Sequence, residues 1–227
     1  MKIVKRILAA MLAAVIVSGM FAPLATEAAT QKIAGGLHFA GWASTTSCYL
    51  SVREQNISAF EYRVYHNSLK FKSSGTSYVY TDGSNEICKI NDLTYRACNF
   101  VSVRAKKNGS WTAWSPKYPI VPRIEGFTSS ITKQPNTVTL TWKKITGVNY
   151  YEVYLSTTGT GNWVKIGSPT GTKITFNKAG GRSLKTYKTY YVKIVACKKF
   201  GKNQMQRSSG NSTKNYNGSF YIRTVYY

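Results

Sequence analysis

Acidic side chains are scarce in this chain of 227 residues, where 8 Asp and Glu stand against 31 Lys and Arg and the formal net charge is +23 at pH 7. The imbalance is uneven, because residues 30–123 hold 12 basic and 5 acidic residues (+7) whereas residues 124–227 hold 16 and 2 (+14). Such an excess raises the local concentration of polyanions at moderate salt. Anionic wall polymers, acidic glycans, lipid headgroups and nucleic acid therefore remain open as partners, beside the alternative that the lysines only confer solubility.

Histidine is nearly absent as well, since His38 and His66 are the only two. Histidine is the usual proton shuttle at neutral pH, and no nucleophile-elbow sequence accompanies either residue. The Cys-x-x-Cys and paired-histidine spacings that mark zinc sites do not occur in the sequence. We therefore predict that the protein is not an enzyme and that it holds no metal.

Long hydrophobic runs are absent after residue 22. The one such run, at 7–22, follows Lys2, Lys5 and Arg6 and leads to a small-residue segment at 26–29, which is the order typical of a secretory signal. We predict a signal peptide at 1–28 and a secreted, extracellular product, associated with a cell surface, that has no transmembrane segment after the signal is removed. A retained anchor is the alternative, but the run is shorter than the roughly 20 residues that a span needs.

Cysteine is limited to Cys48, Cys88, Cys98 and Cys197, which allow three complete pairings. An exported location permits oxidation. Cys88 lies on a predicted strand before a corner and Cys98 lies just after that corner, so a disulfide between these two closes a short loop and is the candidate bridge. Buried free thiols are the alternative.

Sustained helical periodicity is also missing from the mature chain, and strand-like alternation takes its place. One pattern occurs twice, 91 residues apart: a leucine stands six residues before a run that alternates on every second residue. The later copy is Leu184 with Tyr190, Val192, Ile194 and Ala196, and the earlier copy is Leu93 with Asn99, Val101, Val103 and Ala105. Because side-chain direction reverses at each strand residue, this pattern describes a strand that leaves a corner and buries one face. We predict two similar domains, at 30–123 and 124–227.

Further short alternating runs are separated by Gly, Asn, Ser and Pro clusters. In the later half they lie at 137–142, 150–155, 163–166, 173–176 and 220–226, and in the earlier half at 48–52, 62–64, 87–90 and 118–121. Seven or so short strands in the later half, with turns between them, and the same strand order in the earlier half predict an all-β fold of two tandem antiparallel β-sandwiches.

The later half resembles a fibronectin type III domain, which belongs to the immunoglobulin-like sandwiches. The resemblance is carried by Leu140-Thr141-Trp142, by Tyr151-Glu152-Val153-Tyr154, and by Leu184 with its alternating run. It implies that Trp142 packs in the core and that Tyr190 forms the corner between two strands. The earlier half resembles the family less, because Val52 and Asn99 stand where that tryptophan and that tyrosine are expected. Such sandwiches carry many unrelated tasks, so the resemblance implies no cofactor and no single function.

The outward residues of the later half are the first candidate binding surface. With Tyr151, Val153 and Leu155 facing inward, Glu152 and Tyr154 are expected to face solvent. The strands that the resemblance makes neighbours in one sheet then offer the candidates Tyr154, Tyr191, Lys193, Tyr221 and Arg223. Aromatic rings beside cations suit sugars, acidic polymers or another protein. The alternative is cross-strand pairing that only stabilises an exposed sheet.

The earlier half offers a second set of basic and aromatic candidates: Arg63, Tyr65, Phe100, Arg104, Trp111 and Trp114. The segment 110–115 (Ser-Trp-Thr-Ala-Trp-Ser) is similar to the Trp-Ser-x-Trp-Ser box of cytokine-receptor-type fibronectin modules. Its two tryptophans and Arg104 predict cation–π stacking. That stack is either a structural element or an aromatic clamp for a ligand.

Together these observations predict a secreted, non-catalytic binding or spacer protein that contacts an anionic cell-surface polymer or glycan through its basic and aromatic sheet faces. A module for protein–protein adhesion is the alternative. A hydrolytic enzyme lacks a recognisable nucleophile and base, and a nucleic-acid binder lacks a recognition helix or stacking motif, so no specific nucleic acid is expected.

Overall fold

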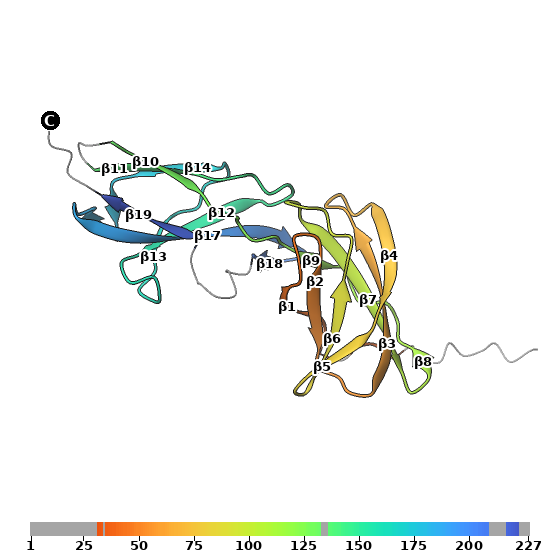
Figure 1. Cartoon of the computed structure of the whole chain (residues 1–227). Helices are drawn as coiled ribbons and strands as arrows, with labels where there is room; N and C mark the ends of the chain where they lie inside the picture. The colour runs from red at the N-terminus through yellow and green to blue at the C-terminus, as the bar shows by residue number, and fades with distance from the viewer. Residues whose placement is uncertain (1–30, 34, 133–135, 209–216, 223–227) are drawn as a thin grey trace, which may run out of the picture. The chain divides into compact units, whose positions relative to one another are not determined.

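The computed structural model describes residues 31–33, 35–132, 136–208 and 217–222, and every regular element in these ranges is a β-strand (Figure 1). The described residues from Lys32 onward form one compact unit by their contacts. The predicted signal peptide at 1–28 lies outside the described residues. Within the described ranges, no helix has the length and apolarity needed to cross a membrane.

The first half forms two antiparallel sheets, whose strands are coloured red to green in Figure 1. One sheet has the order β1-β2-β6-β5, and the other has the order β4-β3-β7-β8, with β9 also paired to β7. The strands are β1 (His38–Trp42), β2 (Cys48–Val52), β3 (Ile57–Tyr65), β4 (Phe71–Ser77), β5 (Val79–Asp82), β6 (Asn85–Ile90), β7 (Asn99–Lys107), β8 (Ser110–Trp111) and β9 (Tyr118–Ile120).

The second half repeats this plan in green to blue. A three-stranded sheet has the order β10-β11-β14, and a five-stranded sheet has the order β13-β12-β17-β18, with β19 also paired to β17. The strands are β10 (Thr128–Thr132), β11 (Thr137–Thr141), β12 (Tyr150–Ser156), β13 (Val164–Gly167), β14 (Lys173–Phe176), β17 (Lys188–Phe200), β18 (Gln204–Arg207) and β19 (Gly218–Ile222), with a small hairpin of β15 (Lys178–Ala179) and β16 (Arg182–Ser183).

Two hydrophobic cores hold the sheets together, and the alternating residues that predicted the strands form them. On β12 the predicted inward residues Tyr151, Val153 and Leu155 are all at most 1% exposed. The second core also contains Trp142, whose ring packs edge-on against Tyr151 at 5.3 Å between ring centroids, so the predicted core position of this tryptophan is confirmed. Apolar burial on this scale is the main favourable term in folding.

The boundary between the two predicted domains, at residues 123 and 124, stays a prediction.

The two corners are closed in equivalent ways by different side chains. The hydroxyl of Tyr190 accepts a hydrogen bond from the backbone N–H of Lys185 at 2.9 Å. In the first half, Oδ1 of the fully buried Asn99 accepts one from the N–H of Thr94 at 2.9 Å, while its Nδ2 donates to the carbonyls of Thr94 and Ala97. In each half the side-chain oxygen accepts from the N–H of the residue five positions earlier, Lys185 for Tyr190 and Thr94 for Asn99. Asn99 therefore replaces the missing corner tyrosine.

The last strand of the first half is interrupted, and polar side chains bridge the gap. Between β8 and β9, Oγ1 of Thr112 accepts a hydrogen bond from the N–H of Ala105, and Oγ of Ser115 accepts one from the N–H of Val103, both at 3.0 Å. The two side-chain oxygens thus satisfy backbone N–H groups of β7 that would otherwise bond to the backbone carbonyls of an uninterrupted last strand.

In the second half, side-chain acceptors likewise bridge the gap between β18 and β19. Oγ of Ser208 accepts from the N–H of Ala196 at 2.9 Å, and Oδ1 of Asn217 accepts from the N–H of Ile194 at 2.6 Å. Ala196 and Ile194 lie 91 residues after their counterparts in the first half, so the repeat extends to how the final strand is attached.

The candidate disulfide between Cys88 and Cys98 is not formed in the structure, where all four cysteines are buried free thiols. Cys88 belongs to the core of the first half, whereas Cys98 packs into the other core, which separates the two side chains. Burial raises the pKa of each thiol to about 12, so both are protonated at neutral pH.

Candidate binding surfaces

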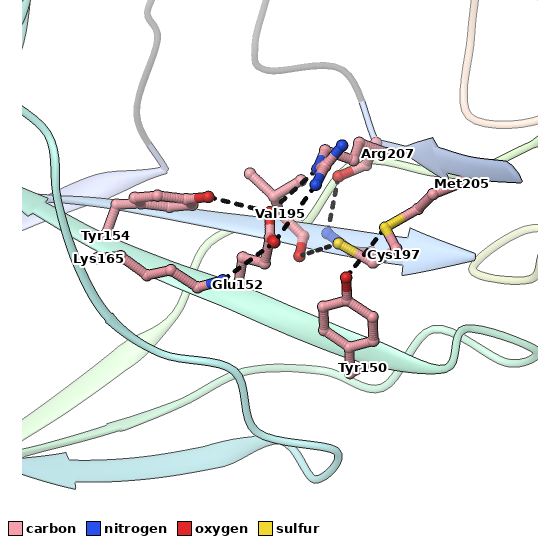
Figure 2. A network of polar contacts seen from close by, with 10 residues as sticks. Tyr150, Glu152, Tyr154, Lys165, Val195, Cys197, Met205 and Arg207 are labelled. Atoms are coloured by element: carbon pink, nitrogen blue, oxygen red, sulfur yellow. Dashed lines mark hydrogen bonds and ion pairs between the residues drawn. The ribbon is translucent and has the colours of Figure 1, made fainter. Parts of the chain in front are cut away.

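A buried carboxylate organises the outer face of the five-stranded sheet in the second half (Figure 2). Glu152 on β12 accepts hydrogen bonds from Nζ of Lys165 at 3.1 Å, from Nε of Arg207 at 3.1 Å and from the hydroxyl of Tyr154 at 2.9 Å. These long side chains cover the carboxylate, which leaves Glu152 only 4% exposed. The expectation that Glu152 faces solvent is therefore wrong, although its side chain does point to the outer face.

The protonation states at this position follow from the same contacts. Burial by itself raises the pKa of Glu152, but the hydrogen bonds from Arg207, Lys165 and Tyr154 outweigh it and hold the pKa at about 2. Burial, followed by the bond to the carboxylate, raises the pKa of Tyr154 to about 12. Glu152 is thus charged at neutral pH, and the hydroxyl of Tyr154 is a donor committed to it.

A basic–aromatic cluster, made of Tyr154, Trp163 and Lys193, lies beside this carboxylate. Nζ of Lys193 is 4.5 Å from the ring centroid of Trp163 and 5.4 Å from that of Tyr154. Tyr154 and Lys193 are direct partners across β12 and β17, which explains why they meet. Burial lowers the pKa of Lys193. The structure therefore brings together two of the predicted residues and adds Trp163, which the sequence placed only in a strand.

The other predicted residues of this face lie along the same strands. Tyr191 is half-buried two residues before Lys193, and its ring lies against Gly159, where an added Cβ would come within 3.0 Å of the ring. Tyr221 on β19 pairs with Thr189 and is 42% exposed. Because residues 189, 191 and 193 alternate onto one face of β17, Tyr221 extends the cluster toward the start of that strand. Arg223 lies outside the described residues.

The first half carries a different arrangement at the equivalent place, a stack of two arginines and two tryptophans. The guanidinium of Arg63 lies 4.1 Å from the ring of Trp114, and that of Arg104 lies 4.9 Å from the rings of both Trp114 and Trp111. Glu61 then binds Arg104 at 2.6 Å. The predicted cation–π stacking is confirmed, and the cations that fill it belong to this chain.

Two further candidates in this half have separate surroundings. Tyr65 is half-buried, with Nζ of Lys117 at 4.2 Å from its ring centroid. Phe100 is only 7% exposed, so its prediction as an outward contact residue is wrong. The reason is that the first five residues of β7 are all buried, so both faces of the strand are covered there. The alternating pattern predicted that only one face is buried.

The carboxylates Glu61 and Glu152 stand 91 residues apart and hold equivalent positions on the two faces. In the first half the paired cation comes from β7 (Arg104), whereas in the second half Lys165 lies on β13 and Arg207 on β18. The repeat spacing indicated this equivalence in the sequence, but the contact of Arg207 with Glu152 could not be predicted because no strand was predicted at 204–207.

The two histidines, His38 and His66, are not among the residues that form these contacts. Both are exposed, and Nε2 of His38 lies 2.9 Å from the carbonyl of Gly35. In the part of the chain that the structure describes, no group of three or more His, Cys, Asp and Glu side chains is placed to hold a metal ion.

The strand order identifies the kind of sandwich. In each half, the second and third long strands lie in different sheets, and the strand after the corner pairs with the third, as β17 pairs with β12 and β7 with β3. Both halves are fibronectin type III-like sandwiches. The second matches the pattern more closely, with three strands in one sheet and the buried tryptophan in its core.

The solved structures that are similar to this chain have low sequence identity and low TM-scores. No protein-family model matches the sequence, and no curated protein is significantly similar to it. A two-domain fibronectin type III segment of chicken tenascin is 18% identical, with a TM-score of 0.31, over 76% of this chain and 95% of that one. A structure of titin domains is 15% identical, with a TM-score of 0.31, over 78% of this chain, which spans 59% of the titin chain.

Proposed function

We propose that this protein is an exported, non-catalytic binding module that contacts anionic polymers or glycans through the second fibronectin type III-like half. The observation that supports this most is the basic–aromatic cluster. Its Lys193 ammonium lies over the rings of Tyr154 and Trp163, and among the described residues no acidic side chain pairs with it.

The charge of the second half supports the same proposal. Its only two acidic residues already have partners, because Glu152 binds Lys165 and Arg207, and Glu125 binds Tyr95 and Arg96. The other basic residues of this half therefore keep their charge uncompensated by acids of the same half. A carboxylated or sulfated sugar offers an anion for Lys193 and a flat apolar face for the neighbouring rings.

Retention on immobilised polygalacturonate at low salt tests the proposal. Lys193→Glu reverses the charge at the centre of the cluster, so we expect it to reduce retention by about tenfold, which corresponds to the loss of one favourable contact. Lys144→Glu, an equal change of charge at an exposed position elsewhere in the same half, is the matched control and should lose less than about threefold. Equal losses in the two variants would mean that only net charge matters and would contradict a site at the cluster.

Adding Arg223→Glu to Lys193→Glu extends the test to the predicted end of the surface. Salt then separates this proposal from protein–protein adhesion. Retention on an anionic polymer should disappear by roughly 0.5 M salt, because charges exposed to solvent are screened, whereas an apolar interface should persist.

A further inference from the structure

The second half contains a pocket that is separate from the basic–aromatic cluster. It has a volume of about 420 Å³ and lies between the end of β12, β13, the β15–β16 hairpin and the start of β17. We call it the hairpin pocket. Its buried floor consists of Leu155, Leu184 and Tyr190, which are 1%, 4% and 6% exposed. A pocket of this volume is within the range of about 300 to 1,000 Å³ that is usual for small-molecule sites.

Three cations line the rim of the hairpin pocket: Arg182, Lys185 and Lys188. All three are exposed, and none of them has an acidic partner among the described residues. The second half cannot supply one from its described acids, because Glu125 and Glu152 are already engaged. The rim is therefore positive while the floor is apolar.

The backbone around the pocket is held in place before any ligand binds. The N–H of Leu184 donates to the carbonyl of Asn177 at 2.9 Å, and the N–H of Lys185 donates to the hydroxyl of Tyr190 at 2.9 Å. At the hairpin turn, Gly180 has φ +58°, and an added Cβ would lie 3.3 Å from Val164 on the pocket wall. The hairpin is thus fixed close to β13, and a preorganised site loses less entropy on binding.

We propose that the hairpin pocket binds a small amphiphilic anion, with its hydrocarbon part on the apolar floor and its carboxylate or phosphate among the three cations. Burial of the hydrocarbon would supply the favourable free energy, and the cations would select the sign of the charge. Leu155 lies on the opposite face of β12 from Tyr154, so this site does not depend on the proposed polymer surface.

Binding of decanoate to the full chain, followed by NMR chemical shifts and titration calorimetry, tests the proposal. We expect saturable shifts that are largest at the amides of Leu184, Lys185 and Tyr190. The double variant Lys185→Glu/Lys188→Glu should weaken binding by about tenfold or more. The matched control Lys143→Glu/Lys144→Glu, at exposed positions outside the pocket lining, should change it by less than about twofold. Equal weakening in both variants would overturn the proposal.

Two further measurements separate the contributions of the floor and the rim. Ser183→Trp fills the pocket from an exposed lining position and should abolish the decanoate shifts while the rest of the spectrum is retained. Decyltrimethylammonium, which has the same chain and the opposite charge, should bind at least about tenfold more weakly. Equal binding of the two amphiphiles, or full binding by Ser183→Trp, would contradict the proposal.

Vesicles containing phosphatidylglycerol distinguish a free amphiphile from a membrane surface as the source of the anion. We expect decanoate to bind in the absence of any vesicle, because the apolar floor and the three cations both belong to the pocket. Binding to the vesicles with no binding of decanoate would overturn the proposal in favour of a lipid surface.

Discussion

At the scale of single residues, two carboxylates organise the sheet faces on which the predicted contact residues lie. Glu61 and Glu152 occupy equivalent positions, and each holds cations that also contact aromatic rings or cover the sheet. Alternation predicted correctly that Glu152 points away from the core. It could not predict that Glu152 is buried, because burial on an outer face depends on long side chains from β13 and β18, which are distant in sequence.

Replacing Glu152 with glutamine tests the role of its charge. A folded pKa of about 2, below the usual value of 4.5, means that ionised Glu152 stabilises the fold fully above about pH 4.5 and loses this contribution as pH falls toward 2. The wild-type free energy of unfolding should therefore exceed that of Glu152→Gln by on the order of 1–2 kcal/mol at neutral pH, since the partners Lys165 and Arg207 are partly exposed. The difference should vanish near pH 2 in urea unfolding. Parallel pH profiles for the two proteins would contradict this role.

The corner of the first half provides a second test at this scale. Asn99→Ala removes three hydrogen bonds and leaves the N–H of Thr94 without its acceptor, so we expect a loss of about 2–4 kcal/mol in the free energy of unfolding. Tyr190→Phe removes the single corner bond of the second half and should cost about 1 kcal/mol. Urea unfolding measures both. A cost below about 0.5 kcal/mol for Asn99→Ala would show that Asn99 does not replace the corner tyrosine.

At the scale of elements, the central strands could be predicted from the sequence, but several edge strands could not. Strands β12, β17 and β7 carry apolar residues on every second position and bury them. By contrast, β10 reads Thr-Ser-Ser-Ile-Thr and is exposed throughout, and β4 contains Gly and Ser at most positions. An edge strand that buries little leaves no periodic signal, because its position is set by backbone pairing with a neighbour.

The attachment of the last strand by side-chain acceptors gives a prediction at this scale. Ser208→Ala leaves the N–H of Ala196 without its acceptor in a buried position, so the free energy of unfolding should fall by about 1–2 kcal/mol. Hydrogen exchange at the amide of Ala196 should become faster. Ser219→Ala, at an exposed position on β19, is the control and should change neither quantity. An unchanged rate of hydrogen exchange at Ala196 in Ser208→Ala would contradict the attachment of the last strand through the Ser208 hydroxyl.

At the scale of the whole molecule, the sequence predicted two related sandwiches and a strongly basic second half. The structure shows where the basic side chains lie and which of them pair with acids. Part of the basic excess is used internally, to cover Glu61 and Glu152, and part remains as the cluster at Lys193 and the rim of the hairpin pocket. The pocket could not be predicted, because it forms where a short hairpin between β14 and β17 folds over β13, and no sequence pattern marks that contact.

The most direct measurement for the proposed function is the affinity for soluble polygalacturonate as a function of salt, compared with neutral dextran. We expect the wild-type affinity to fall steeply between about 0.05 and 0.5 M salt, as the Debye length shortens, and we expect dextran not to bind. Lys193→Glu should bind more weakly at low salt and show a shallower dependence on salt. Affinity that is independent of salt, or equal for the acidic and the neutral polymer, would contradict the proposed binding of anionic polymers.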